Sequence, residues 1–382
     1  MLLFCLSVRV SRPLPLSLSL ARAHAGAGSA GGAGSRLFSS EPLRILYLGS
    51  PSVSSSVLLH LHSFASAHPQ VSIVGVVSLP SKPRDRNKIT PTPVSQTAAS
   101  LSLPLFTPST LKKSLSQSFY SSLPSFNLAV TCAYGLYLPR PFLSLPKHGT
   151  INLHPSLLPL YRGAAPVQRQ LCNGESTLGT SLLYTVSSMD AGPMIWQGSE
   201  PNDFKSGASL VLDNLMMKAA HRLTGHDGKG EGVLDQVLNG SMSFNKAVEQ
   251  NHDLSTHAKI ISKEEGRINF NTMTAEQVTN RLLGFEGWPG TTVSVRLTRP
   301  NAADDEDMVL GVTQVEVQTF QDVDEEAQTN GEIVFDKFRK AFKVGCKDRS
   351  LRIIQRVKPA GKKEMDARSF FNGLRGGRIY PK

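Results

Sequence analysis

The chain has 382 residues, of which 40% are hydrophobic and 19% charged. This length accommodates two or three domains with their own cores, and the apolar fraction excludes a chain that is disordered throughout. Lys and Arg exceed Asp and Glu by 41 − 30 = 11, so we expect an anionic partner. The four cysteines lie far apart without a C-x-x-C pair, which argues against a disulfide scaffold and against a zinc site of that spacing. The sequence contains no run of about 18 apolar residues, so we expect no membrane-spanning helix.

Residues 1–40 have the composition of an organelle transit peptide. They contain no acid before Glu41 and are rich in Leu, Ser, Ala and Gly, with basic residues at Arg9, Arg12, Arg22 and Arg36. A secretory signal would need one continuous apolar block, which the segment 11–15 interrupts. The alternative is a basic, disordered amino terminus. We predict a mitochondrial presequence over 1–40 and a mature protein in the mitochondrial matrix.

Residues 41–240 alternate between strand and helix patterns. The runs 43–49, 71–77 and 128–133 are short and apolar, as in strands that are buried on both faces. Between the first two, a helical spacing places on one face Val53, Val57, Leu61 and Phe64. This alternation predicts an α/β domain with a Rossmann-like, mostly parallel sheet, in which ligands lie at the carboxyl ends of the strands.

The second half of the chain predicts a linker over 241–258 and a small antiparallel β-barrel over 259–382. The evidence for the barrel is a set of short alternating runs at 292–297, 342–344 and 351–354. Its charge is divided: residues 301–332 hold ten acids and no Lys or Arg, whereas residues 333–382 hold fifteen Lys and Arg and four acids. The basic carboxyl end is typical of a surface that contacts phosphates.

The chemistry is concentrated in the segment 150–159. Side chains alternate along a strand, so Asn152 and His154 point to the same face, and Pro155 ends the strand directly after them. Both polar groups therefore lie at a carboxyl end, where an α/β site is expected. An imidazole that exchanges protons beside an amide that donates to an oxyanion suits acyl transfer.

Asp190 is a further candidate, because it precedes a small-Gly-Pro turn and could reach a neighbouring strand end. A carboxylate that faces His154 would orient the imidazole. A structural histidine and an ordinary turn aspartate are equally compatible with the spacing, because the three residues do not form a local motif.

The run from Asn152 to Arg169, NLHPSLLPLYRGAAPVQR, closely resembles the methionyl-tRNA formyltransferase family. Shorter matches occur at 91–94, 133–139, 262–268 and 359–365, so the resemblance extends from about residue 43 to about residue 374. The chain departs from the family in its first strand-to-helix turn, where Ser52 and Val53 follow the proline. Its basic loop is about one residue shorter, and its acidic segment 301–332 is longer.

This resemblance implies a catalytic role for Asn152, His154 and Asp190. It implies 10-formyltetrahydrofolate as the formyl donor, without a metal. The expected folate-contacting residues are Ser156, Leu157, Leu158 and Pro159, with Tyr134 and Gly135 close by. The implied reaction gives formylmethionyl-tRNA for mitochondrial translation initiation.

The resemblance also implies an RNA partner, the initiator methionyl-tRNA. The Pro-rich loop 80–93 reads on composition as a solvated loop, but it matches the family's insertion that enters the acceptor stem. Its expected contacts are Lys82, Arg84, Arg86 and Lys88, and an OB-like carboxyl-terminal barrel would add Lys362 and Lys363. We expect no DNA partner, no membrane and a monomer.

Two other functions remain open from the sequence. A formyltransferase that acts on a small amine, such as glycinamide ribonucleotide or an amino sugar nucleotide, would share the catalytic residues but would leave the basic loop and basic end without a role. A non-catalytic tRNA-binding protein would not need the three catalytic side chains. Acceptor-dependent turnover distinguishes these alternatives.

Overall fold

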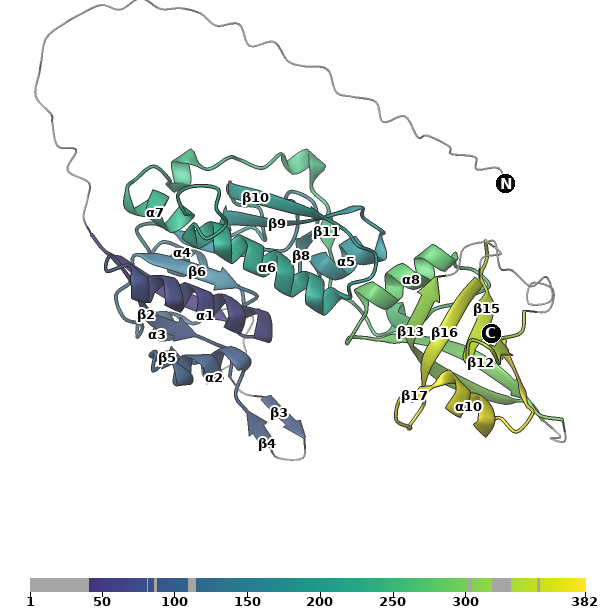
Figure 1. Cartoon of the computed structure of the whole chain (residues 1–382). Helices are drawn as coiled ribbons and strands as arrows, with labels where there is room; N and C mark the ends of the chain where they lie inside the picture. The colour runs from purple at the N-terminus through teal and green to yellow at the C-terminus, as the bar shows by residue number, and fades with distance from the viewer. Residues whose placement is uncertain are drawn as a thin grey trace, which may run out of the picture. The chain divides into compact units, whose positions relative to one another are not determined.

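The computed structural model describes residues 41–80, 82–85, 88–108, 115–300, 304–317, 331–348 and 351–382 (Figure 1). The expected presequence and Arg86 lie outside these residues. Within the described ranges, no helix is long and apolar enough to cross a membrane.

A seven-stranded sheet forms the centre of the first domain, in the order β10-β9-β7-β6-β1-β2-β5. Five strands run parallel, and β9 and β10 are antiparallel at one edge, which confirms the mostly parallel sheet. The strands are β1 (Leu43–Gly49), β2 (Val71–Val77), β5 (Leu105–Phe106), β6 (Leu128–Cys132), β7 (Thr150–His154), β9 (Thr177–Tyr184) and β10 (Met194–Pro201).

Helices cover both faces of this sheet. On β1, Ile45 and Tyr47 pack in one cluster with α1 and α6, whereas Leu46 packs in a second cluster with Phe142 of α4. Burial on both faces explains why β1 is continuously apolar. The expected face of α1 is buried at all four positions. The helices are α1 (Ser52–Ala67), α2 (Pro93–Ser100), α3 (Gln117–Tyr120), α4 (Arg140–Leu143), α5 (Pro166–Cys172), α6 (Ala208–Thr224) and α7 (Val233–Leu238).

The basic loop that follows β2 contains a small antiparallel hairpin. Its strands are β3 (Lys82–Asp85) and β4 (Lys88–Thr90), with Lys82 opposite Thr90. Figure 1 shows this hairpin extending beyond the sheet and its helices. Because β2 runs parallel to β1, β6 and β7, the hairpin follows the same carboxyl edge at which Asn152 and His154 lie.

Residues 241–258, which we expected to be a linker and call the strap, are hydrogen-bonded to the first domain. Within the strap are η1 (Phe244–Lys246), η2 (His252–Leu254) and β11 (His257–Ala258). β11 pairs in parallel with β8 (Arg162–Gly163), and Val248 bridges to Met194 of β10. The strap therefore contacts two segments of the catalytic domain, although its sequence has no strand-like apolar pattern.

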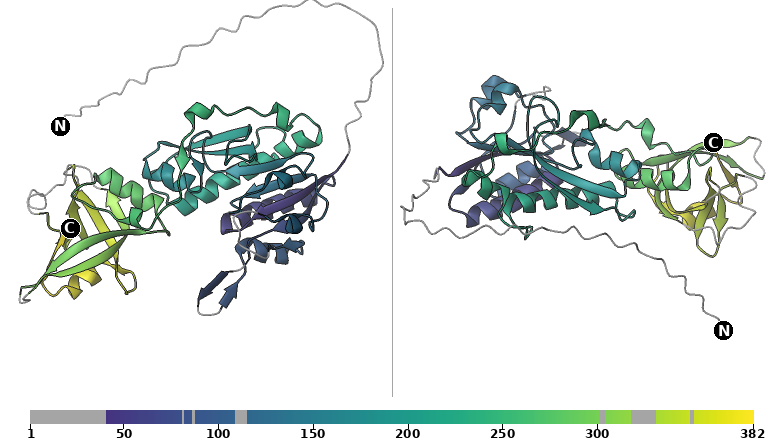
Figure 2. Two further views of the ribbon diagram at one scale, coloured as in Figure 1. Left: turned by 180° about the vertical axis from the view of Figure 1, so that it is seen from behind. Right: turned by 90° about the horizontal axis from the view of Figure 1, so that it is seen from above.

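The carboxyl-terminal domain is an antiparallel β-barrel with α8 and α10 beside it (Figure 2). Its main path is β14-β15-β16-β13-β12-β18, and a bridge between Ile333 and Ile379 joins the two ends. Buried and more exposed residues alternate along β12, because one face of the strand packs on the core and the other faces outward. The elements are η3 (Glu264–Gly266), α8 (Ala275–Gly284), β12 (Thr291–Thr298), β13 (Glu306–Val317), β14 (Val334–Asp336), β15 (Ala341–Gly345), β16 (Leu351–Pro359), β17 (Met365–Asp366), α10 (Ala367–Gly373) and β18 (Arg378–Pro381).

Candidate active site

Asn152 and His154 lie at the carboxyl end of β7, as the alternation along the strand predicted. Asn152 is opposite Thr131 of β6, and His154 is opposite Ser181 of β9. His154 is only 4% exposed, and the strand ends at His154, directly before Pro155. Flanking strands on both sides therefore hold the two side chains at an edge where ligands reach α/β sheets.

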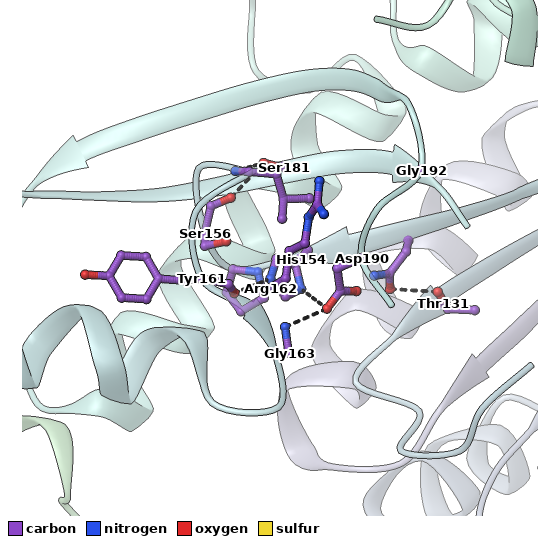
Figure 3. A network of polar contacts seen from close by, with 12 residues as sticks. Thr131, His154, Ser156, Tyr161, Arg162, Gly163, Ser181, Asp190 and Gly192 are labelled. Atoms are coloured by element: carbon purple, nitrogen blue, oxygen red, sulfur yellow. Dashed lines mark hydrogen bonds and ion pairs between the residues drawn. The ribbon is translucent and has the colours of Figure 1, made fainter. Parts of the chain in front are cut away.

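Asp190 comes from the loop between β9 and β10 and faces His154 (Figure 3). The distance from Asp190 Oδ2 to His154 Nδ1 is 3.7 Å, and both side chains are largely buried. The same Oδ2 accepts a hydrogen bond of 2.9 Å from the backbone N–H of Gly163. Asp190 has a left-handed backbone with φ of 50°. The hydrogen bond from Gly163 therefore keeps the carboxylate of Asp190 oriented toward the imidazole of His154.

The other ring nitrogen of His154 is already engaged. Nε2 lies 3.0 Å from the carbonyl oxygen of Tyr161, which can only accept a hydrogen bond, so Nε2 carries the proton. Nδ1 is then the nitrogen that can exchange a proton with a ligand. Tyr161 is itself held, because its backbone N–H donates to Thr256 Oγ1 of the strap at 2.8 Å.

The amide of Asn152 is oriented by its neighbour on β6. Thr131 Oγ1 donates a 2.7 Å hydrogen bond to Asn152 Oδ1. The adjacent thiol of Cys132 does not take part as a thiolate, because burial raises the pKa of Cys132 to about 11. The site thus presents an amide N–H₂ group, an imidazole nitrogen and a carboxylate.

The expected folate-contacting segment begins two residues after His154. Ser156 and Leu158 are buried, and Ser156 Oγ donates to Leu160 O at 2.7 Å, so this hydroxyl stabilises its own loop. Leu157 and Pro159 are partly exposed. Ser181 Oγ accepts from the Leu158 N–H and donates to the Ser156 carbonyl, which anchors the segment to β9.

Tyr134 and Gly135 follow β6 at the same edge of the sheet. Tyr134 is buried, and burial raises the pKa of its hydroxyl. Gly135 is exposed with φ of 89°, a conformation that favours glycine, and its backbone is open to an approaching ligand. Among the described residues, no group of three or more His, Cys, Asp or Glu side chains is arranged to hold a metal ion.

Two residues of the site were not identified from the sequence. Arg162 is 6% exposed, and its guanidinium donates to Gln250 Oε1 at 3.1 and 2.6 Å; its Nη2 also lies 2.9 Å from Nδ1 of His252. Burial lowers the pKa of Arg162, and the nearby charge of Asp190 opposes this effect. Arg162 lies within the run NLHPSLLPLYRGAAPVQR and could have been selected there. Gln250 lies in a polar stretch that gives no local signal.

The expected tRNA-contacting residues lie on two domains. The structure describes the backbone of Lys82, Arg84 and Lys88 in the hairpin, whereas Lys362 and Lys363 are exposed on the turn between β16 and β17. An open hollow of about 400 Å³ is lined by Arg169, His257, Lys259, Ile260 and Glu265. Arg169 is paired with Glu265, so part of the positive charge in the hollow is neutralised.

Comparison with known proteins identifies the family. Residues 43–206 match the model described as formyl transferase, and residues 260–375 match formyl transferase, C-terminal domain. The chain is 33% identical over 334 residues to a methionyl-tRNA formyltransferase of Listeria innocua, covering 86% of this chain and 95% of that protein.

Two solved structures share the fold. WlaRD, a sugar 3N-formyl transferase, is 16% identical with a TM-score of 0.53, and the match covers 84% of this chain and 99% of that one. The N-formyltransferase of Helicobacter canadensis is 14% identical with a TM-score of 0.54, covering 82% and 98%. With both domain models matched in order and a relative aligned over nearly its whole length, this chain belongs to the methionyl-tRNA formyltransferase family of formyl-transferring enzymes.

Proposed function

We propose that this enzyme transfers the formyl group of 10-formyltetrahydrofolate to the α-amino group of methionyl-tRNA. The observation that carries the proposal is the convergence of Asn152, His154 and Asp190 at one edge of the sheet. The proposed acceptor rests on the Listeria innocua relative, because the match to that methionyl-tRNA formyltransferase includes both domains.

A formyl-folate is compatible with the residues beside His154. The two solved structures of this fold were crystallised with 5-N-formyl-THF and with folinic acid. In this chain, the partly exposed Leu157 and Pro159 and the exposed backbone of Gly135 offer apolar surface and an open main chain. We assign the folate to this surface, with the buried Ser156, Leu158 and Tyr134 supporting it from behind.

The residues of this site divide the formyl transfer into two tasks. When the neutral amine of the aminoacyl ester attacks the formyl carbon, the carbonyl oxygen becomes an oxyanion. Asn152 donates to it through Nδ2, because its Oδ1 is occupied by Thr131. Protonated His154 donates through Nδ1, because its Nε2 is occupied by Tyr161. One such donor is typically worth about 10²–10³ in rate.

The second task is to move a proton. The new C–N bond leaves a proton on the attacking amine, and the C–N10 bond of the donor can break once N10 receives a proton. Asp190 can take up this proton, and the protonated His154 beside it can give its Nδ1 proton to N10. A proton transfer from Asp190 to His154 then restores both groups, and Asp190 keeps the imidazole oriented. Tetrahydrofolate and formylmethionyl-tRNA are then the products, with no net proton or electron left over.

The proposed tRNA surface has two parts. The β3–β4 hairpin, with Lys82, Arg84 and Lys88, follows the carboxyl edge of the sheet that carries the catalytic side chains, and we assign it to the acceptor stem. Arg86, which lies outside the described residues, is assigned to the same contact from the sequence. Lys362 and Lys363 on the barrel would contact phosphates farther along the tRNA. Phosphate contacts position an RNA and give a salt-dependent affinity.

We further propose that residues 1–40 direct the protein to the mitochondrial matrix, where its product initiates translation. The argument is the absence of acids and the spread of four arginines in this segment. Residues 1–40 fused to a fluorescent protein should enter mitochondria, and the same fusion with all four arginines changed to alanine should stay in the cytosol. Equal distribution of the two fusions would contradict this address.

Formyl incorporation tests the reaction and the acceptor together. Residues 41–382 with labelled 10-formyltetrahydrofolate should label methionyl-tRNA but not uncharged tRNA, glycinamide ribonucleotide, an amino sugar nucleotide or buffer. The variant His154→Ala, which retains the tRNA surface, should bind tRNA and transfer no label. Label on a small amine would identify that amine, and not methionyl-tRNA, as the acceptor. Binding of tRNA without any transfer would identify a binding protein instead of an enzyme.

A further inference from the structure

Gln250 belongs to the strap, but its side chain is buried in the catalytic domain and only 4% exposed. Its Nε2 donates to the backbone carbonyls of Asp190 at 2.9 Å and Gly192 at 2.7 Å. Its Oε1 accepts both hydrogen bonds from Arg162, at 3.1 and 2.6 Å. A side-chain amide has two N–H donors and two acceptor lone pairs, so every one of them is used here.

The two bonds that Gln250 donates end on the loop that carries the catalytic carboxylate. Asp190 holds a left-handed backbone, and Gly192 is buried so close to β9 that a Cβ there would lie 1.8 Å from the carbonyl oxygen of Tyr184. Without Gln250, the buried Gly192 carbonyl would lose this partner, which is unfavourable because a buried acceptor would be left unsatisfied. The hydrogen bonds of the Gln250 amide are therefore among those that fix this loop, together with the bonds from the Gly163 N–H to Asp190 and from the Tyr137 hydroxyl to the Ser187 carbonyl.

The bonds that Gln250 accepts end on the segment that holds the imidazole. Arg162 directly follows Tyr161, whose carbonyl oxygen accepts the hydrogen bond from His154 Nε2. Arg162 directly precedes Gly163, whose N–H donates to Asp190 Oδ2. The side chain of Gln250 thus connects the segment that binds the His154 ring with the loop that carries Asp190. The distance between these two side chains, from His154 Nδ1 to Asp190 Oδ2, is 3.7 Å.

We propose that Gln250 is a positioning residue that sets the separation of His154 and Asp190 for formyl transfer. This inference rests on the proposed function, because it assigns Gln250 a role in the step that those two side chains carry out. Gln250 touches neither side chain of the pair through its own hydrogen bonds. Its effect is transmitted through the carbonyls of the loop and through Arg162.

Two substitutions separate the two halves of the amide. Gln250→Met keeps the length and removes all four hydrogen bonds. Gln250→Glu keeps an acceptor for Arg162 but places a carboxylate oxygen against the carbonyls of Asp190 and Gly192. Both variants should lower kcat by about 10- to 100-fold, since displacement of a catalytic group by about 1 Å has an effect of this size. KM for methionyl-tRNA and for the folate should stay unchanged.

A double-mutant cycle distinguishes positioning from general stability. If Gln250 acts through Asp190, then Gln250→Met in an Asp190→Asn background should lower kcat by no more than about threefold further. A structural role would multiply the two losses. The matched control is Gln236→Met on α7, whose Nε2 also donates to a backbone carbonyl, that of Glu231 at 3.3 Å. It should leave kcat at the wild-type value in both backgrounds.

The outcomes are separable from those of the proposed function. An inactive wild-type enzyme would overturn both the reaction and this inference. With an active wild type, an unchanged kcat in Gln250→Glu, or losses that multiply in the cycle, would overturn the positioning role alone. Large falls in kcat with constant KM, together with non-multiplying losses, are the result that we expect.

Discussion

Thr131 Oγ1 donates a 2.7 Å hydrogen bond to Asn152 Oδ1 across the β6–β7 pair. In this arrangement Oδ1 faces β6, and Nδ2 is the free donor. A flipped amide would present an oxygen to a developing oxyanion and would repel it. In the proposed reaction, the hydroxyl of Thr131 holds the amide of Asn152 with Nδ2 available to the oxyanion.

Thr131→Val should lower kcat about fivefold, because the loss of one hydrogen bond of about 1 kcal/mol leaves the amide free to rotate. Asn152→Ala removes the donor altogether and should cost about 10²–10³. Thr150→Val is the matched control, since Thr150 is a buried β7 residue whose hydroxyl has no partner among the described residues. Steady-state formylation rates measure all three; equal rates for the two Thr→Val variants would contradict this role.

Asp190→Asn should lower kcat by about 10²–10⁴ with little change in melting temperature. The substituted amide can still accept the Gly163 N–H, so the loop stays in place, but the negative charge beside His154 is lost. Asp253→Asn, at an exposed position of the strap, should leave the rate unchanged. Rates comparable to the wild type in Asp190→Asn would exclude a role for this carboxylate in proton transfer.

Gly192→Ala should reduce both activity and stability. The added Cβ would lie 1.8 Å from the Tyr184 carbonyl oxygen, so the loop of Asp190 must shift. We expect kcat to fall by about 10²-fold and the free energy of unfolding by about 1–3 kcal/mol. Gly373→Ala meets open space and should change neither quantity. Rates and thermal melts of both variants decide whether this close approach matters.

Alanine at Lys82 or Arg84 should raise KM for methionyl-tRNA and leave kcat at saturating tRNA unchanged. Each lost phosphate contact should also reduce the slope of log affinity against log salt by about one. Lys229→Ala, an exposed position after α6, serves as the control for a general loss of charge. Filter binding over a range of salt concentrations tests this; identical slopes in all proteins would make the hairpin an ordinary surface element.

Acid should destabilise the catalytic domain through His60. Burial, followed by repulsion from His221 and His226, lowers the pKa of His60 to about 4. The unfolded chain, with a histidine pKa of about 6.5, binds a proton in a range where the folded chain does not. Stability is therefore lost as the pH falls from about 6.5 to about 4. Solvent screening moderates the effect, because His60 is only partly buried.

His60→Gln tests this dependence, since glutamine does not titrate and can still bond to Thr224, which lies 2.8 Å from His60 Nε2. Between pH 7 and pH 5 its melting temperature should fall by a few degrees less than that of the wild type. His62→Gln, two residues farther along α1, should behave as the wild type does. The same pH-dependent fall in both variants would assign the acid sensitivity to other groups.

The sequence by itself was sufficient for the central strands β1, β2 and β6, for the buried face of α1 and for the placement of Asn152 and His154. A strand that is buried on both faces is apolar along most of its length, so β1 and β6 could be recognised as continuous apolar runs in the sequence. The period of a strand placed Asn152 and His154 on one face, and the proline after them placed both at its end. These are local properties, because periodicity and turn residues depend only on neighbours in the chain.

Only the tertiary structure decided which distant residues complete the site. Asp190, Arg162 and Gln250 lie on three separate segments, and their contacts come from the order of the strands and the path of the strap. A polar segment whose buried groups are satisfied by hydrogen bonds has no apolar periodicity. For this reason the sequence of the strap resembled that of a linker. Its buried amide is recognisable only when its four partners are in place, because hydrogen-bond satisfaction depends on the folded surroundings.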